Sequence, residues 1–277
     1  MFFFLVLIVC LVPEYPATNA SATSPDNFTS NIFGGENANP RKYKFMVFVT
    51  DGTFVCGGSI LDTKTVLTAA HCVCETPNLF VIAGASNPVG IVKNQTNITN
   101  EQFRVVERVI VYPGYNCSDS DKAELIGDIA VLKLLEPFSF NKFVGDPVVI
   151  PNSELEKRAK RVGDCRRLGY GLKSKYPEVL PQRLQELFVK VRSISFCRKM
   201  WSEVGVSWNG KLLCTYNGFG KGTCGGDSGS PVVCFVNSRP IHMATHTFGT
   251  RSCVFGLNGA MRTLRYRTWI REQLNAA

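Results

Sequence analysis

Short apolar runs separated by turn residues constrain the fold of this chain more than any other feature. The runs are rich in Val, Ile and Phe, and Gly, Pro, Asn and Asp lie between them. Short strands at such spacing predict an all-β protein, either a sandwich or barrels, and periodicity alone does not choose between the two. The predicted strands are Phe45–Thr50, Thr65–Ala69, Leu79–Gly84, Phe103–Tyr112, Ile129–Leu134, Pro147–Ile150, Leu184–Val191, Leu212–Tyr216, Pro231–Val236 and Ile241–Phe248.

Two segments fall outside this strand pattern. Leu264–Leu274 places Tyr266, Trp269 and Ile270 at helical spacing among arginines, which predicts a C-terminal amphipathic helix. Lys157–Arg161 carries basic side chains near the junction of the two halves of the chain. We expect this second segment to form an exposed linker.

The N-terminus has the pattern of a targeting segment. Phe2–Val12 is an unbroken apolar run ended by Pro13. It is too short to cross a bilayer as a helix, which needs about 20 residues. Small residues follow at Ala20–Ala22, so we predict a signal peptide over residues 1–22. The mature protein should then be secreted, to the extracellular space or a secretory granule.

The cysteine content indicates the redox environment of the protein, and its charge limits the kinds of partner. Of the 11 cysteines, Cys10 lies in the leader, which leaves an even number and indicates an oxidising compartment. The formal net charge of +9 would suit an anionic glycan or an acidic membrane surface, or it is simply a solvated surface without a partner. The sequence contains no phosphate loop and no nucleic-acid-binding motif, so we expect no nucleic-acid partner.

Three short motifs carry residues typical of nucleophilic catalysis. Gly222–Pro231 places Ser228 between glycines, Leu67–Cys72 contains His71, and Gly127–Leu132 contains Asp128. A serine hydroxyl is a weak nucleophile until a base takes its proton and donors stabilise the oxyanion that follows. Each of these residues alone could be structural, as a core histidine, a strand-edge cap or a turn residue.

In the order His, Asp, Ser, the three motifs resemble those of the trypsin/chymotrypsin family of serine endopeptidases. The resemblance runs from about Ile32 to the C-terminal helix. It implies two packed six-stranded antiparallel β-barrels with a C-terminal α-helix and the catalytic cleft between them. The protease domain would cover residues 32–277, with the first barrel at about 32–145 and the second at about 146–277.

The resemblance also assigns catalytic roles. It implies that Ser228 attacks the scissile carbonyl, that His71 is the general base, and that Asp128 orients the imidazole. The backbone N–H groups of Gly226 and Ser228 would form the oxyanion hole. No cofactor and no metal is implied.

The specificity pocket is carried over from the family in the same way. Gly222 occupies the position of the pocket floor, and Gly249 and Gly259 occupy its walls. An uncharged, open pocket predicts an aromatic or large aliphatic P1 side chain, that of the residue before the scissile bond, because a buried lysine or arginine would lack a partner. Thr247 stands where the family places a serine that supports the aspartate. His246 either contributes to the pocket wall or only packs in the core.

The disulfide pattern of the family can be placed on these cysteines. The implied pairs are Cys56–Cys72, Cys165–Cys234, Cys197–Cys214 and Cys224–Cys253. Cys74 and Cys117 remain, on loops expected to rim the active site, and we predict a fifth bridge between them. A metal site at His71, Cys72 and Cys74 is the alternative, which an oxidising context disfavours.

Activation departs from the family pattern. Ile32–Gly35 matches the mature start, so residues 23–31 would form a short activation propeptide, and the freed amino group of Ile32 would pair with Asp227. The residue before the cut is Asn31, where most family precursors carry Arg or Lys. Phe54 stands where several precursors place a histidine that holds the aspartate before cleavage.

The remaining expectations concern glycans and partners. Asn94, Asn97 and Asn116 begin sequons, and Cys117 at the middle position makes Asn116 the weakest of the three. We expect protein or peptide substrates, protein protease inhibitors as partners, and a monomer. The alternatives are a non-catalytic cationic homologue that acts in binding or host defence, and a structural or adhesive glycoprotein. The intact set of motifs favours the enzyme.

Overall fold

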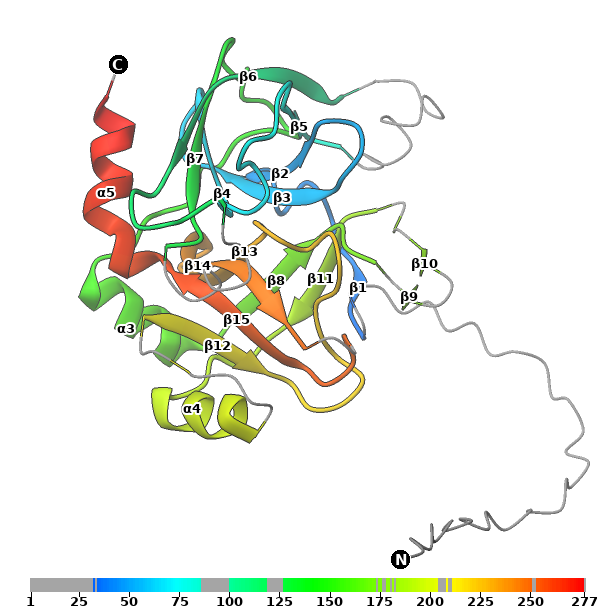
Figure 1. Ribbon diagram of the computed structural model, residues 1–277, viewed down its shortest axis with the longest axis vertical. Coiled ribbons are helices and arrows are strands. Elements are labelled where there is room, and N and C mark those ends of the chain that lie inside the picture. The colour runs from blue at the N-terminus through cyan, green and yellow to red at the C-terminus, as the bar shows by residue number, and fades with distance from the viewer. Residues whose placement is uncertain are drawn as a thin grey trace, which may run out of the picture.

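The fold was obtained as a computed structural model, shown in Figure 1. It describes residues 32, 34–85, 100–118, 127–172, 174–175, 178–179, 181, 183–203, 208, 211–250 and 253–276. The predicted signal peptide, the propeptide, and the sequons at Asn94 and Asn97 lie outside the described residues. Asn116 lies within them and is exposed.

The first half of the chain forms a closed antiparallel barrel in the strand order β2-β3-β4-β7-β6-β5 (Figure 1). Several of its strands are buried along most of their length, such as β2, whose sequence is MVFVT. The first six-stranded barrel is therefore confirmed. The strands are β2 (Met46–Thr50), β3 (Cys56–Ile60), β4 (Thr65–Thr68), β5 (Phe80–Ala83), β6 (Gln102–Val111) and β7 (Ala130–Leu134).

Strand β3 was not predicted, because its sequence CGGSI contains two glycines, which weaken strand propensity. Close packing requires these glycines. A Cβ at Gly57 would lie 2.0 Å from Ser230 Oγ, and one at Gly58 would lie 2.9 Å from a Val47 methyl carbon. Gly57 thus lets the first barrel approach the segment that follows Ser228.

The second half forms a seven-stranded sheet in the order β1-β11-β8-β13-β14-β15-β12. One isolated antiparallel bridge, Val191 to Thr215, joins the segment after β11 to β12. A second closed barrel is not confirmed by this topology. The strands are β1 (Glu36–Asn37), β8 (Cys165–Gly169), β11 (Gln185–Phe188), β12 (Leu212–Tyr216), β13 (Pro231–Val236), β14 (Arg239–Gly249) and β15 (Leu257–Arg262), and β9 (Ser174–Lys175) pairs with β10 (Glu178–Val179) as a separate ribbon.

Strand β8 was not predicted either, because its sequence CRRLG carries two adjacent arginines. Arg167 is nevertheless only 1% exposed, and it pairs with Leu187 of β11 and Val232 of β13. Conversely, the predicted strand Pro147–Ile150 makes only one parallel bridge, from Val149 to Ile241. Proline has no N–H to contribute to a strand ladder.

The described residues contain three helices, α3 (Ser153–Val162), α4 (Ile194–Glu203) and α5 (Thr263–Asn275). The predicted C-terminal helix is confirmed as α5. It follows the last strand of the second half and lies against the first barrel (Figure 1), where the Tyr266 hydroxyl accepts a hydrogen bond from the Gly127 N–H at 3.2 Å. Among the described residues, no helix has the length and apolar character needed to span a membrane.

The expectation of a linker at Lys157–Arg161 was wrong, because these residues belong to α3. The expected exposure is confirmed for all of them except Ala159. Asn152 Oδ1 caps the helix by accepting from the Leu155 N–H at 2.8 Å, and Gly163 ends it with φ of 73°. Acidic residues lie in the first turn and basic residues in the last, which suits the helix dipole. The Glu156 carboxylate binds Arg262 through two hydrogen bonds, which anchors the helix to β15.

All five predicted disulfides are present. The Cys74–Cys117 bridge joins the segment after His71 to the segment before Asp128. It closes a separation of 43 residues in sequence. The bridge therefore restrains the first-barrel side of the candidate site.

Removal of this bridge should perturb the rim of the site more than the fold. We expect the double variant Cys74→Ala/Cys117→Ala to lose about 2–4 kcal/mol of unfolding free energy, measured by denaturant titration, and to remain folded. Amide hydrogen exchange should become faster in the segments that carry His71 and Asp128. The control Cys197→Ala/Cys214→Ala opens a bridge in the second half and should leave exchange in those segments unchanged. Equal exchange there in both variants would count against a role at the rim.

Candidate active site

His71 and Asp128 are brought together by the pairing of β4 with β7. His71 follows the end of β4, Asp128 precedes the start of β7, and Thr68 pairs with Ala130. The distance from His71 Nδ1 to Asp128 Oδ2 is 2.7 Å, and the His71 backbone N–H donates to Asp128 Oδ1 at 2.9 Å. Two bonds from one residue fix the carboxylate in place.

The two side chains of this pair differ in burial. The Asp128 side chain is 1% exposed, whereas that of His71 is 31% exposed. A carboxylate that accepts from Nδ1–H holds the imidazole in the tautomer whose Nε2 is unprotonated and can accept a proton. The arrangement therefore gives His71 the orientation of a general base.

Ser228 lies on a turn that reaches back to the first barrel. Its carbonyl accepts from the Gly57 N–H at 2.7 Å, and the Thr68 hydroxyl donates to the Gly57 carbonyl at 2.8 Å. Gly229 has φ of 76°, and a Cβ there would lie 2.3 Å from Thr68 Oγ1. The Ser228 turn thus docks against the strand end that leads to His71.

The turn before Ser228 presents backbone N–H groups. Gly226 has φ of 93°, a conformation that favours glycine, and the Asp227 N–H donates to the Cys224 carbonyl at 3.1 Å. Among the residues that the structure describes, neither the Gly226 N–H nor the Ser228 N–H donates to a protein acceptor. Two such donors beside a serine hydroxyl would suit the binding of an oxyanion.

Asp227 is fully buried next to Ser228. Its carboxylate accepts from the Gly171 N–H and the Cys224 N–H, each at 2.9 Å. Burial raises the pKa of Asp227 to about 6, although both N–H groups and the Arg167 guanidinium lower it. A Cβ at Gly169 or Gly171 would lie within 2.1 or 2.4 Å of this carboxyl group, so both positions require glycine.

A cavity of about 350 Å³ opens beside Ser228. Of the residues predicted for the specificity pocket, Thr247 and Gly249 line it, whereas Gly222 and Gly259 do not. A Cβ at Gly222 would lie 2.2 Å from the Cys253 carbonyl oxygen, and one at Gly259 would lie 2.4 Å from the Phe248 ring, so both positions are packed by neighbours.

Further residues contribute to this cavity. His246 and Thr223 line it, so His246 is part of the wall. The Thr247 hydroxyl donates to the Thr245 carbonyl at 3.5 Å, and Asp128 accepts from His71 instead. The Thr247 hydroxyl therefore does not donate the hydrogen bond to Asp128 that the resemblance implied.

Ile32, the predicted mature start, is fully buried in an apolar cluster of the second half. Asn31 and Phe33 lie outside the described residues. The Phe54 N–H donates to Asp51 and its carbonyl accepts from the Thr50 hydroxyl. Asp227 is thus held by backbone N–H groups, not by a side chain at position 54.

The sulfur atoms of Cys56 and Cys72 lie near His71. Both are joined in one disulfide. A metal ligand would have to be a thiolate, and an oxidised cysteine offers none. These two side chains act as a crosslink that fixes the segment carrying His71.

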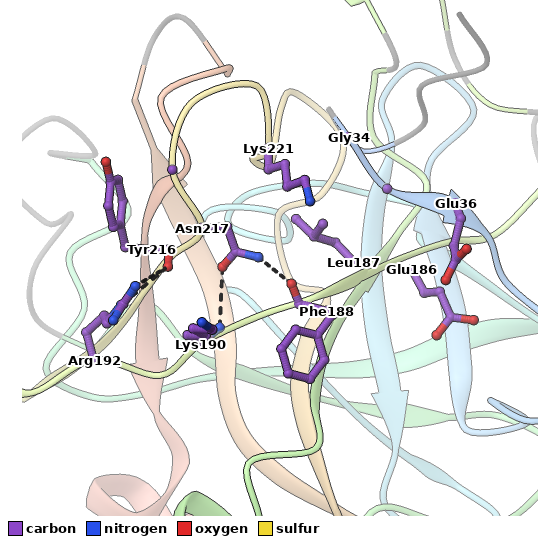
Figure 2. A pocket seen from close by; sticks show the side chains of 12 residues that line it. Gly34, Glu36, Glu186, Leu187, Phe188, Lys190, Arg192, Tyr216, Asn217 and Lys221 are labelled. Carbon is purple, nitrogen blue, oxygen red and sulfur yellow. Dashed lines mark hydrogen bonds between the residues drawn. The ribbon is translucent and has the colours of Figure 1, made fainter.

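A larger cavity, of about 650 Å³, lies away from the triad candidates. Figure 2 shows Lys190 and Arg192 on one part of its wall, Glu36 and Glu186 on another, and Lys221 apart from both pairs, near Gly34. Because both signs of charge are present, this cavity does not single out an anionic ligand. The predicted anionic glycan or surface partner stays a prediction.

Comparison with known proteins identifies the family. The trypsin family model matches residues 32–270, which is most of the chain. The chain belongs to the trypsin family. It is 30% identical to coagulation factor IX of Oryctolagus cuniculus over 251 residues, which cover 89% of this chain and 85% of the relative.

Two further relatives support this membership. Coagulation factor IX of Cavia porcellus is 28% identical over 91% of this chain and 84% of its own sequence. The snake venom serine protease catroxase-1 of Crotalus atrox is 30% identical over 73% of this chain and 71% of its own sequence. In this trypsin-family chain, the sequence motifs indicated His71, Asp128 and Ser228 but not Arg167, whose guanidinium donates to His246 Nδ1 behind the cavity wall. Because β8 was not predicted, no strand pattern in the sequence marked Arg167 as buried.

Proposed function

We propose that this trypsin-family chain is a secreted serine endopeptidase that hydrolyses peptide bonds through Ser228, His71 and Asp128. The observation that carries the proposal is the buried Asp128 carboxylate bound to His71 Nδ1, on the barrel edge against which the Ser228 turn docks. A structural or adhesive glycoprotein has no need of this arrangement.

The reaction follows from these groups. Ser228 Oγ attacks the carbonyl carbon while His71 Nε2 takes its proton, and Asp128 stabilises the resulting imidazolium. The N–H groups of Gly226 and Ser228 bind the oxyanion. His71 then protonates the leaving amine, which leaves an acyl group on Ser228. Water attacks this ester with His71 as base, and His71 then returns the proton to Ser228 Oγ as the ester bond breaks and the acid leaves.

The chain would be made as a precursor. A signal peptide over residues 1–22 and a propeptide over residues 23–31 would precede a mature enzyme that begins at Ile32, with barrels on both sides of the cleft. Five disulfides support passage through an oxidising compartment. Substrates would be proteins or peptides, protein protease inhibitors would be its partners, and the enzyme would act as a monomer.

The P1 preference depends on the pocket. The sequence predicts an aromatic or large aliphatic P1 side chain because Gly222 places no charge at the floor. Gly222 does not line the cavity beside Ser228, so that argument does not rest on a residue of the cavity wall. This P1 preference stays a prediction.

The alternative is a non-catalytic cationic homologue, which the net charge of +9 would suit. Digestion of an unfolded protein by the cleaved chain separates the two functions. Mass spectrometry should find cuts at internal bonds with the wild type and none with Ser228→Ala. Equal fragment patterns from both proteins, or intact substrate with both, would contradict the endopeptidase.

A further inference from the structure

Arg167 is a buried cation without a close anionic partner. Its Nε donates to Thr215 Oγ1 at 3.0 Å, and its Nη1 donates to His246 Nδ1 at 2.7 Å. In the part of the chain that the structure describes, its Nη2 has no hydrogen-bond partner. No described carboxylate lies within 4.0 Å of its guanidinium. A buried, unpaired charge is costly and calls for a function.

The guanidinium keeps its charge at neutral pH. Burial lowers the pKa of Arg167 to about 9, and the charge of Asp227 opposes this shift. Asp227 acts on it from a longer distance, because its own carboxylate oxygens are held by two backbone N–H groups. At pH 7 the second half of the molecule therefore carries a positive charge in its interior.

This charge lies directly behind the wall of the cavity beside Ser228. His246 lines that cavity and accepts the Arg167 hydrogen bond on Nδ1, so its proton lies on Nε2. Burial, the Arg167 guanidinium and His71 all hold the pKa of His246 well below its ordinary value. The imidazole is thus a neutral dipole between the guanidinium and the cavity.

The residues that line the cavity do not cancel the positive potential of Arg167. The lining residues include the hydroxyl-bearing Thr223 and Thr247 and contain no Asp or Glu among the described residues. The Thr223 hydroxyl donates to Asn258 Oδ1 at 2.5 Å, so a polar pair also lies next to the cavity. A carboxylate there would meet the positive potential of Arg167 and no opposing carboxylate among the described residues.

Activation would strengthen the effect. In the proposed mature enzyme the amino group of Ile32 pairs with Asp227 and neutralises it. The Arg167 charge then loses the compensation that Asp227 gives it in the uncleaved chain. A substrate carboxylate in the cavity would restore the balance of charge.

We propose that the cavity beside Ser228 selects an acidic P1 side chain, with Arg167 supplying the positive field through His246. The inference rests on the proposed endopeptidase function and deepens it by naming the substrate class. It differs from the preference for aromatic or large aliphatic side chains that the sequence predicts. Arg167 acts here as a positioning residue, since it lies behind His246 and does not touch the substrate.

The wild-type cleavage profile tests the inference directly. Cleaved chain beginning at Ile32 is assayed on peptides that differ only at P1, with Glu, Asp, Phe, Leu, Lys or Arg. We expect kcat/KM for Glu to exceed that for Phe by about tenfold or more. A preference for Phe or Leu would overturn the inference and leave the endopeptidase intact. Failure to cut any peptide of the set would overturn the proposed function together with this inference.

Variants at Arg167 separate charge from packing. Arg167→Met keeps a long apolar stem and should lower kcat/KM for Glu by about tenfold while that for Phe is unchanged or raised. Arg167→Lys keeps the charge and should retain the Glu preference. The control Arg239→Met removes an exposed arginine at the start of β14 and should leave both values unchanged. Equal loss on Glu and Phe in Arg167→Met would show a structural role only and would overturn the inference.

Discussion

Replacement of Ser228 by Ala is expected to lower kcat by at least about 10⁴-fold and to leave the free energy of unfolding nearly unchanged. The reason is that the nucleophile is lost while the docking of its turn is kept. The contact with the first barrel uses the Ser228 carbonyl and the Gly57 N–H, neither of which the substitution removes. Steady-state hydrolysis of a peptide that the wild type cleaves gives the measurement.

His71→Ala should cost about as much, and the double variant should cost little more than either single variant, because the two residues act as one unit. The control Ser202→Ala removes an exposed serine on α4, whose hydroxyl donates to Lys199, and should keep wild-type turnover. Turnover by purified Ser228→Ala at the wild-type rate would contradict the assignment of the nucleophile.

Blocking the cut after Asn31 is expected to give the second largest loss. We expect Asn31→Pro to hold the chain as a precursor with activity at least about 100-fold below that of the cleaved enzyme. The free amino group of Ile32 would pair with the buried Asp227, beside the N–H groups proposed for the oxyanion. In the cleaved enzyme, Asp227→Asn should cause a similar loss. Full activity of Asn31→Pro, or an active form that starts elsewhere by N-terminal sequencing, would contradict this mechanism.

In both forms stability falls as pH rises, but in different pH windows. In the uncleaved chain the pKa of Asp227 is raised to about 6, so the stability contributed by its neutral form is lost as pH rises through that value. In the cleaved enzyme, the ion pair should raise the pKa of the Ile32 amino group above its ordinary value of about 8. Stability of the active form is then present below that ordinary value and is lost as pH rises through the raised one. Activity of the cleaved enzyme against pH should show this alkaline limb.

The sequence predicted most of the first barrel because its strands are apolar runs bounded by turn residues. It missed β15 as well as β3 and β8. The compositions of β3 and β8 are set by packing between segments far apart in the chain. Gly57 is dictated by Ser230, which lies in the other half. Arg167 is buried where a surface charge would be assumed, and only the fold brings Thr215 and His246 to it.

The candidate site also has residues that motifs predicted and residues that only the fold reveals. Motifs found His71, Asp128 and Ser228 because these residue types recur with characteristic neighbours. The pocket could not be predicted from motifs alone, because Gly222 is packed against Cys253 and the cavity wall is formed by His246. The linker expectation for Lys157–Arg161 was wrong because a high charge also suits a helix with one buried face, on which Ala159 lies.

Covalent labelling of the cleaved enzyme with a diphenyl phosphonate tests the central claim most directly. Such a reagent reacts with a serine only where a base and oxyanion donors activate it. Peptide mapping should find one adduct, on Ser228, whose formation is lost in His71→Ala and kept in the control Ser202→Ala. No adduct on Ser228 in the correctly cleaved, folded enzyme, or equal labelling of His71→Ala, would contradict catalysis by this triad.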